Sequence, residues 1–157
     1  MGKPVLEKVD ELFDRMPHAV EYCFANTTLW EMSKIIQQTP GMIAVVGSME
    51  NYCFQGFIRP DNLMVVMNNC PEAKDFTAIN FIDPQSTLFT TEPGELVSSV
   101  IPKMKEYCTP ILAVLDEKNE LVGTITLSQI AEQYLKDDNI TGWREVLKAL
   151  ARMGHLF

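Results

Sequence analysis

The sequence lacks a long apolar run, and no stretch of its 157 residues approaches the roughly 18 uninterrupted apolar residues that span a bilayer. The N-terminus, with Lys3, Glu7 and Asp10, also lacks the apolar region of a signal peptide. Basic residues are fewer than acidic ones. The sequence has 13 Lys and Arg and 21 Asp and Glu, which gives a formal net charge of -8. This balance disfavours nucleic acid or an anionic membrane as the main partner, since both need a basic face. We therefore expect a cytoplasmic protein.

Metal-ligating and catalytic patterns are also missing. The four cysteines, at positions 23, 53, 70 and 108, form no C-x-x-C pair, and His18 and His155 are the only histidines. This spacing disfavours a zinc site or a disulfide framework, so we interpret the cysteines as mostly buried, reduced thiols. The sequence shows no P-loop and no convergent set of acid, base and nucleophile. We therefore expect no catalytic residue, no metal and no required cofactor.

An internal repeat is the most informative feature that is present. Near the C-terminus, a strand-like segment at 111–116 is followed by a polar turn, a second strand-like segment at 121–126 and a helical pattern from Leu127. A looser copy lies earlier, with apolar segments 43–46 and 54–58 before a helix that Pro60 can open. Periodicity adds a strand and a helix ahead of each hairpin. Each copy is therefore predicted as strand, helix, strand, strand, helix, which makes one supersecondary unit used twice.

Local signals predict further elements. Helical spacing from Val5 to Met16 indicates a first helix, and residues 18–22 are interpreted as a short strand. The next helix starts after Thr28, which fits an S/T-x-x-E capping box with Glu31. In the second copy, Pro102 lies inside a predicted helix and is expected to kink or shorten it. A last amphipathic helix follows at the C-terminus.

The order of these elements resembles the CBS domain, a module that occurs mostly in tandem as a Bateman module. The resemblance covers roughly Val9 to Leu135. It is clearest at Pro110–Asp116 and Leu121–Thr126, which are similar to the family's proline-led strand and glycine-containing turn. It implies an α/β (α+β) fold of two β-α-β-β-α repeats related by a pseudo-twofold axis, with extra N- and C-terminal helices. We expect 1–74 to form the first repeat with its helix and connector, 75–138 the second repeat, and 139–157 a C-terminal helix.

The resemblance also implies a ligand. Members of the family commonly bind adenosine-containing ligands in clefts between the two repeats, and commonly pair into homodimers. The implied function is a non-catalytic regulatory module that binds AMP, ADP or ATP and acts on an unknown partner protein. The residues carried over from the family are Thr126, Ser128, Gln129, Thr109 and Ile111 for one cleft, and Arg59, Asp61, Asn62 and Ile43 for the other.

Departures from the family pattern keep a second function open. Gln129 and Asn62 stand where the family places a ribose-binding aspartate, and Asp61 comes one position early. An amide oxygen can accept from a ribose hydroxyl, but without the charge-assisted strength of a carboxylate. Thr126 and Gln129 also fit a capping box, which gives both a purely structural role. The alternative is a ligand-free interaction or dimerisation module with degenerate nucleotide sites, although Arg59 at a helix start favours a phosphate.

Overall fold

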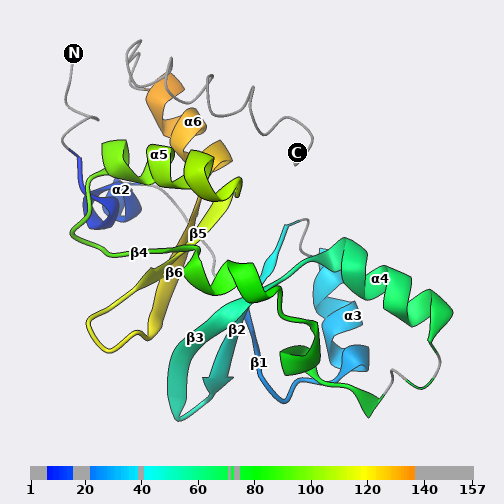
Figure 1. The fold of residues 1–157 in the computed structure, drawn as a ribbon. Helices are drawn as coiled ribbons and strands as arrows, with labels where there is room; N and C mark the ends of the chain where they lie inside the picture. The colour runs from blue at the N-terminus through cyan, green and yellow to red at the C-terminus, as the bar shows by residue number, and fades with distance from the viewer. Residues whose placement is uncertain (1–6, 16–21, 39–40, 71, 73–74, 137–157) are drawn as a thin grey trace. The chain divides into compact units, whose positions relative to one another are not determined.

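A computed structural model describes residues 7–15, 22–38, 41–70, 72 and 75–136. Strand, helix, strand, strand and helix recur in both copies, so the predicted repeat and the α/β fold are confirmed (Figure 1). Within these residues, two three-stranded sheets have the orders β1-β2-β3 and β4-β5-β6. The elements are α2 (Val9–Arg15), β1 (Tyr22–Phe24), α3 (Leu29–Gln38), β2 (Ile43–Ser48), β3 (Asn51–Ile58), α4 (Pro60–Asn69), the 3₁₀ helices η2 (Ala78–Phe81) and η3 (Pro84–Leu88), β4 (Thr90–Thr91), α5 (Val97–Tyr107), β5 (Ile111–Leu115), β6 (Leu121–Thr126) and α6 (Leu127–Lys136).

The described residues divide into two compact units, each with one sheet. The first-copy unit contains 22–88 together with 117–121, and the second-copy unit contains 7–15, 89–116 and 122–136. Helix α2 therefore belongs with the second copy, whereas the expected boundaries grouped it with the first. The reason is a set of backbone hydrogen bonds, in which the Val9 N–H donates to the Glu95 carbonyl at 2.9 Å and the Val97 N–H donates to the Glu7 carbonyl at 2.7 Å.

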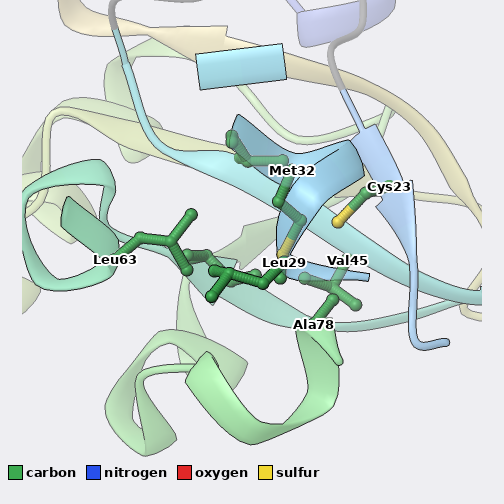
Figure 2. Close-up of a cluster of buried hydrophobic side chains, with 8 residues drawn as sticks. Cys23, Leu29, Met32, Val45, Leu63 and Ala78 are labelled. Carbon is green, nitrogen blue, oxygen red and sulfur yellow. The ribbon is translucent and has the colours of Figure 1, made fainter. Parts of the chain in front are cut away.

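Helices α3 and α4 cover one face of the β1-β2-β3 sheet and enclose an apolar cluster (Figure 2). Side chains alternate between the faces of a strand, so every second residue of β1 and β2 points to these helices. Each fully buried aliphatic side chain stabilises the unit by roughly 1.5–3 kcal/mol. The predicted cap of α3 is present, because Thr28 Oγ1 accepts from the Glu31 N–H at 3.3 Å. The buried members of the cluster are Cys23, Leu29, Met32, Ile43, Val45, Ile58, Leu63 and Ala78.

A bulge in β3 is held by the segment that follows α4. The pairing of β2 with β3 shifts register after Val45, which lies opposite Gly56. Gly56 has a φ of +139, a backbone conformation that side-chain-bearing residues rarely adopt. The fully buried Ser86 holds the next residue, because its hydroxyl oxygen accepts from the Phe57 N–H at 2.7 Å. The Asp83 N–H donates to the Phe57 carbonyl at 3.0 Å. Residues 83–86 are therefore bonded to β3.

Some local expectations differ from the structure. β1 begins at Tyr22 and ends at Phe24, so residues 18–21 of the expected strand lie outside the described residues, as does the expected helix at 139–157. Of the two effects expected of Pro102, a kink or a shorter helix, the shortening is absent, because α5 continues to Tyr107. Four buried side chains hold α5 in place and offset the backbone hydrogen bond that Pro102 removes. They are Val97, Val100, Ile101 and Met104.

Candidate ligand-binding site

The start of α6 receives its polar residues directly from β6. Thr126 and Gln129 close a capping box, in which Thr126 Oγ1 accepts from the Gln129 N–H at 3.1 Å and Gln129 Oε1 accepts from the Thr126 N–H at 3.0 Å. The Leu127 N–H donates to the Pro110 carbonyl at 2.9 Å, which ties the helix start to the strand that follows Pro110. The structural role of Thr126 and Gln129 is therefore confirmed. Among the described residues, Thr126 Oγ1 acts as an acceptor, and Ser128 is exposed.

Thr109 and Ile111 lie beside this helix start, but their polar atoms bond to each other. The Thr109 hydroxyl donates to the Ile111 carbonyl at 2.9 Å and accepts from the Ile111 N–H at 3.3 Å. The Thr109 side chain is 1% exposed. This arrangement is a local turn that a Thr side chain makes with its own backbone. The Thr109 hydroxyl therefore holds the start of β5, and its proton is donated within this turn.

The start of α4 is more open than the start of α6. Arg59 is the N-cap residue, with extended backbone and no side-chain cap, and Pro60 is in the first turn as predicted. Pro60 has no N–H, so the N–H groups of Asp61 and Asn62 are the orphan donors of this helix end. The half-buried Arg59 side chain adds a positive charge at the same place. Two N–H groups without a partner in the helix, a helix dipole and a guanidinium are groups that bind a phosphate.

Ile43 is brought next to this helix start by strand pairing. It lies opposite Ile58, the residue before Arg59, in the antiparallel pair of β2 and β3. Its side chain is fully buried in the apolar cluster. The side chain of Ile43 is therefore unavailable, and its contribution to a site is limited to the backbone. The exposed Asp61 carboxylate, in the first turn of α4, adds an acceptor for hydroxyl groups.

Three aromatic residues form a cluster that the sequence did not assign to a site. Tyr22 and Phe24 flank Cys23, whose side chain is in the apolar cluster, so both rings lie on the sheet face opposite α3 and α4. The ring centroid of Tyr22 is 5.7 Å from that of Phe24 and 5.8 Å from that of Tyr52. A hydrogen bond with Tyr52, followed by burial, raises the pKa of the Tyr22 hydroxyl. The sequence signal for this cluster is the pair of aromatic residues at i and i+2, Tyr22 and Phe24. The prediction of a strand over 18–22 excluded Phe24 and hid this signal.

The thiols and acids show no second centre in the part of the chain that is described. Cys23 is buried, Cys53 and Cys70 are half-buried and Cys108 is exposed, so only Cys23 fits the expectation of burial well. Burial raises the pKa of the Cys23 thiol to about 12, which keeps it protonated and unreactive at neutral pH. Among the described residues, no three His, Cys, Asp or Glu side chains gather as metal ligands. None of the described helices is both long enough and apolar enough to cross a membrane.

Neither a protein-family model nor a curated protein matches this sequence. Solved structures match its fold. The CBS domain pair of protein MJ0100, in complex with 5'-methylthioadenosine and S-adenosyl-L-methionine, is 17% identical at a TM-score of 0.65, over 84% of this chain and 98% of that chain. The CBS domain of a bacterial CNNM/CorC family Mg2+ transporter, in complex with ATP, is 16% identical at a TM-score of 0.67, over 85% and 90%. CBS domain protein PAE2072 from Pyrobaculum aerophilum, complexed with AMP, is 13% identical at a TM-score of 0.64, over 83% and 97%.

The chain has the fold of a CBS domain pair. The resemblance inferred from the sequence is thereby confirmed at the level of the fold. The structure brings together two sets of the site residues predicted from the CBS resemblance, one set in each unit. Thr109, Ile111 and Thr126 meet where the Leu127 N–H bonds to Pro110. Ile43 and Arg59 meet where β3 ends.

Proposed function

We propose that this chain is a non-catalytic regulatory module that binds an adenosine-containing ligand of the AMP, ADP or ATP type. The fold supports the proposal, because three CBS proteins that share it were solved with AMP, ATP, or S-adenosyl-L-methionine and 5'-methylthioadenosine. The residues of a site, and not the fold that carries them, determine what a protein binds. The proposal therefore depends on what the residues of this chain can bind.

The open N-terminus of α4 is the observation that carries the proposal. Arg59 stands at the N-cap without a side-chain cap, and the two N–H groups that follow Pro60 have no helical partner. A nucleotide phosphate placed there accepts from these N–H groups and from the guanidinium, and the helix dipole adds to the attraction. The Asp61 carboxylate accepts from ribose hydroxyls instead, because it repels a phosphate.

The aromatic cluster of Tyr22, Phe24 and Tyr52 belongs to the same unit and supplies a second requirement of the ligand. A purine base has an extended π-face, and aromatic side chains hold such faces by stacking. The rings of this cluster lie on the face of the sheet that α3 and α4 leave uncovered. We assign to them the adenine, with Arg59 and the start of α4 assigned to the phosphate. The set around Thr126 is the weaker candidate, because its capping box already uses two of its polar groups.

A calorimetric titration with AMP, ADP and ATP tests the proposal. We expect one of the three to bind with saturation, and we expect Arg59→Ala to weaken the phosphate-bearing ligand by about tenfold or more, which is the loss of one charge-assisted contact. Lys34→Ala is the matched control, since it removes one positive charge from the same unit, on α3 and not at the start of α4. An equal loss of affinity in both variants would mean that the effect of Arg59→Ala comes from the change in net charge and not from a contact at α4. No heat with any ligand would refute the proposal.

The ligand-free alternative is favoured by one specific observation on α4. Met64, Val65 and Met67 are 53%, 60% and 40% exposed, which leaves an apolar face on a helix that carries a single charge, Asp61. Such a face is typical of a surface covered by another protein, and pairing of two copies through it produces a homodimer. Sedimentation of wild type and Val65→Lys distinguishes the cases. Dimerisation that Val65→Lys abolishes, without any nucleotide binding, supports the dimerisation module.

A further inference from the structure

Exposed apolar side chains gather on the first-copy unit at a place that neither α4 nor the aromatic cluster includes. Trp30 is 69% exposed, Ile79 is 55% exposed and Phe76 is 46% exposed. We call these three residues the Trp30 patch. Tryptophan is rarely left this open, because burying its ring removes a large apolar area from water. An open Trp with apolar neighbours therefore needs an explanation.

Backbone hydrogen bonds bring the parts of the Trp30 patch together. Trp30 lies in the first turn of α3, whereas Phe76 and Ile79 lie around η2. An antiparallel bridge joins Thr28 to Thr77. The Ala78 N–H donates to the Thr27 carbonyl at 2.8 Å, and the Ile79 N–H donates to the Ala25 carbonyl at 3.1 Å. The start of α3 and the segment 76–79 therefore lie side by side.

The Trp30 patch rests on a rigid base. Leu29 and Ala78, which lie next to Trp30 and Ile79 in the chain, are buried in the apolar cluster shown in Figure 2. The Thr77 backbone N–H also donates to Asn80 Oδ1 at 2.9 Å, which fixes the start of η2. Binding to a surface that is already ordered costs little conformational entropy. The Trp30 patch is thus preorganised for a partner.

Charges at the edge of the patch favour a basic partner. Glu31 follows Trp30, Asp75 precedes Phe76, and both side chains are exposed. In the described part of the chain, neither carboxylate forms an ion pair. Among the described residues, the cation beside Trp30 is Lys34, whose Nζ lies 5.2 Å from the centroid of the Trp30 ring. An apolar centre with an acidic rim is complementary to a segment that carries apolar and basic residues together.

We propose that the Trp30 patch docks a basic amphipathic segment of a partner protein. In this arrangement, an apolar face of the segment covers Trp30, Phe76 and Ile79, while its Lys or Arg side chains meet Glu31 and Asp75. Trp is among the residues that contribute most binding energy when an interface covers them. The docking does not depend on nucleotide binding, because none of these residues lies at the start of α4 or in the aromatic cluster.

Fluorescence anisotropy with synthetic peptides tests the proposal in the absence of nucleotide. The probe is a labelled peptide of about 18 residues whose leucines and lysines form opposite faces of a helix, and a scrambled peptide of the same composition is its control. We expect the amphipathic peptide to bind, and we expect Trp30→Ala to weaken it by at least about tenfold. Met49→Ala is the matched control, since Met49 is 74% exposed and lies in the turn between β2 and β3.

Charge reversal provides the second measurement. Glu31→Lys with Asp75→Lys is expected to weaken the lysine peptide and to allow an otherwise identical glutamate peptide to bind. Both substituted residues are exposed, so the fold is retained, and circular dichroism verifies this. Equal binding of the scrambled peptide, or equal binding by wild type and Trp30→Ala, would overturn the proposal. Self-association of wild type that Trp30→Ala abolishes would also overturn it, because a second copy would then be the occupant.

Discussion

Replacing Gly56 by alanine is the sharpest test of the fold, because one methyl group meets two obstacles. A Cβ built on Gly56 lies 2.5 Å from Ile82 Cγ2 and 3.0 Å from Ser86 Oγ. Its φ of +139 is in addition a conformation that an alanine adopts only under strain. A sparsely populated backbone conformation costs about 1–3 kcal/mol, and overpacking of a buried site costs about 1–3 kcal/mol. We expect Gly56→Ala to lower the free energy of unfolding by about 2–6 kcal/mol.

Urea denaturation followed by circular dichroism measures this loss. Gly41→Ala is the matched control in the same unit, since an added Cβ at Gly41 meets nothing within 4 Å. A substitution without a clash changes the stability by less than about 1 kcal/mol, so the control midpoint stays close to that of wild type. A Gly56→Ala midpoint within the range of the Gly41→Ala midpoint would refute both the bulge geometry and the contact of residues 82–86 with β3.

Three further outcomes follow from the same structure. Ser86→Ala leaves the buried Phe57 N–H without its acceptor and is expected to cost about 1–3 kcal/mol, whereas Ser99→Ala, at an exposed position in α5, should leave the urea midpoint unchanged. Cys108 has a φ of 51 at the end of α5, so Cys108→Gly should relieve up to about 1 kcal/mol of backbone strain and raise the melting temperature. A lower melting temperature would contradict the left-handed cap. Burial raises the pKa of the Cys23 thiol to about 12, so its contribution to the free energy of unfolding is complete below the pKa of the unfolded chain and is lost as pH rises toward the pKa of the folded protein. Cys23→Ala should therefore flatten the decline of stability at alkaline pH, and an unchanged slope would count against this burial.

The elements that the sequence predicted well are those with strong local signals. The hairpin of β5 and β6 and helix α6 follow from two apolar runs, a polar turn and a helical pattern, and none of these needs knowledge of distant contacts. The capping box of Thr126 and Gln129 was predictable for the same reason, since its spacing is fixed within one helical turn. Pro60 likewise marked the start of α4.

The features that the sequence did not reveal depend on distant contacts. Helix α2 joins the second copy through backbone groups, which leave no side-chain signature in the sequence. The aromatic cluster needs the register of a strand of three residues, and a pattern this short does not determine its own ends. The burial of Thr109 and the hydrogen bond of its hydroxyl to the Ile111 carbonyl depend on a local turn, which the family resemblance does not describe.

The exchange of segments between the two units has a consequence for synthesis on the ribosome. Helix α2 emerges before the rest of its unit, yet the carbonyl of Glu95 that accepts from its Val9 N–H is made 86 positions later (95 − 9). The first-copy unit also waits, because residues 117–121 complete it and the Phe54 N–H donates to the Asn119 carbonyl at 3.1 Å. Neither unit is therefore complete until both copies have left the exit tunnel, and a nascent chain arrested after β4 holds two unfinished units. A cut at the centre of the sequence separates the repeats but delivers neither unit whole.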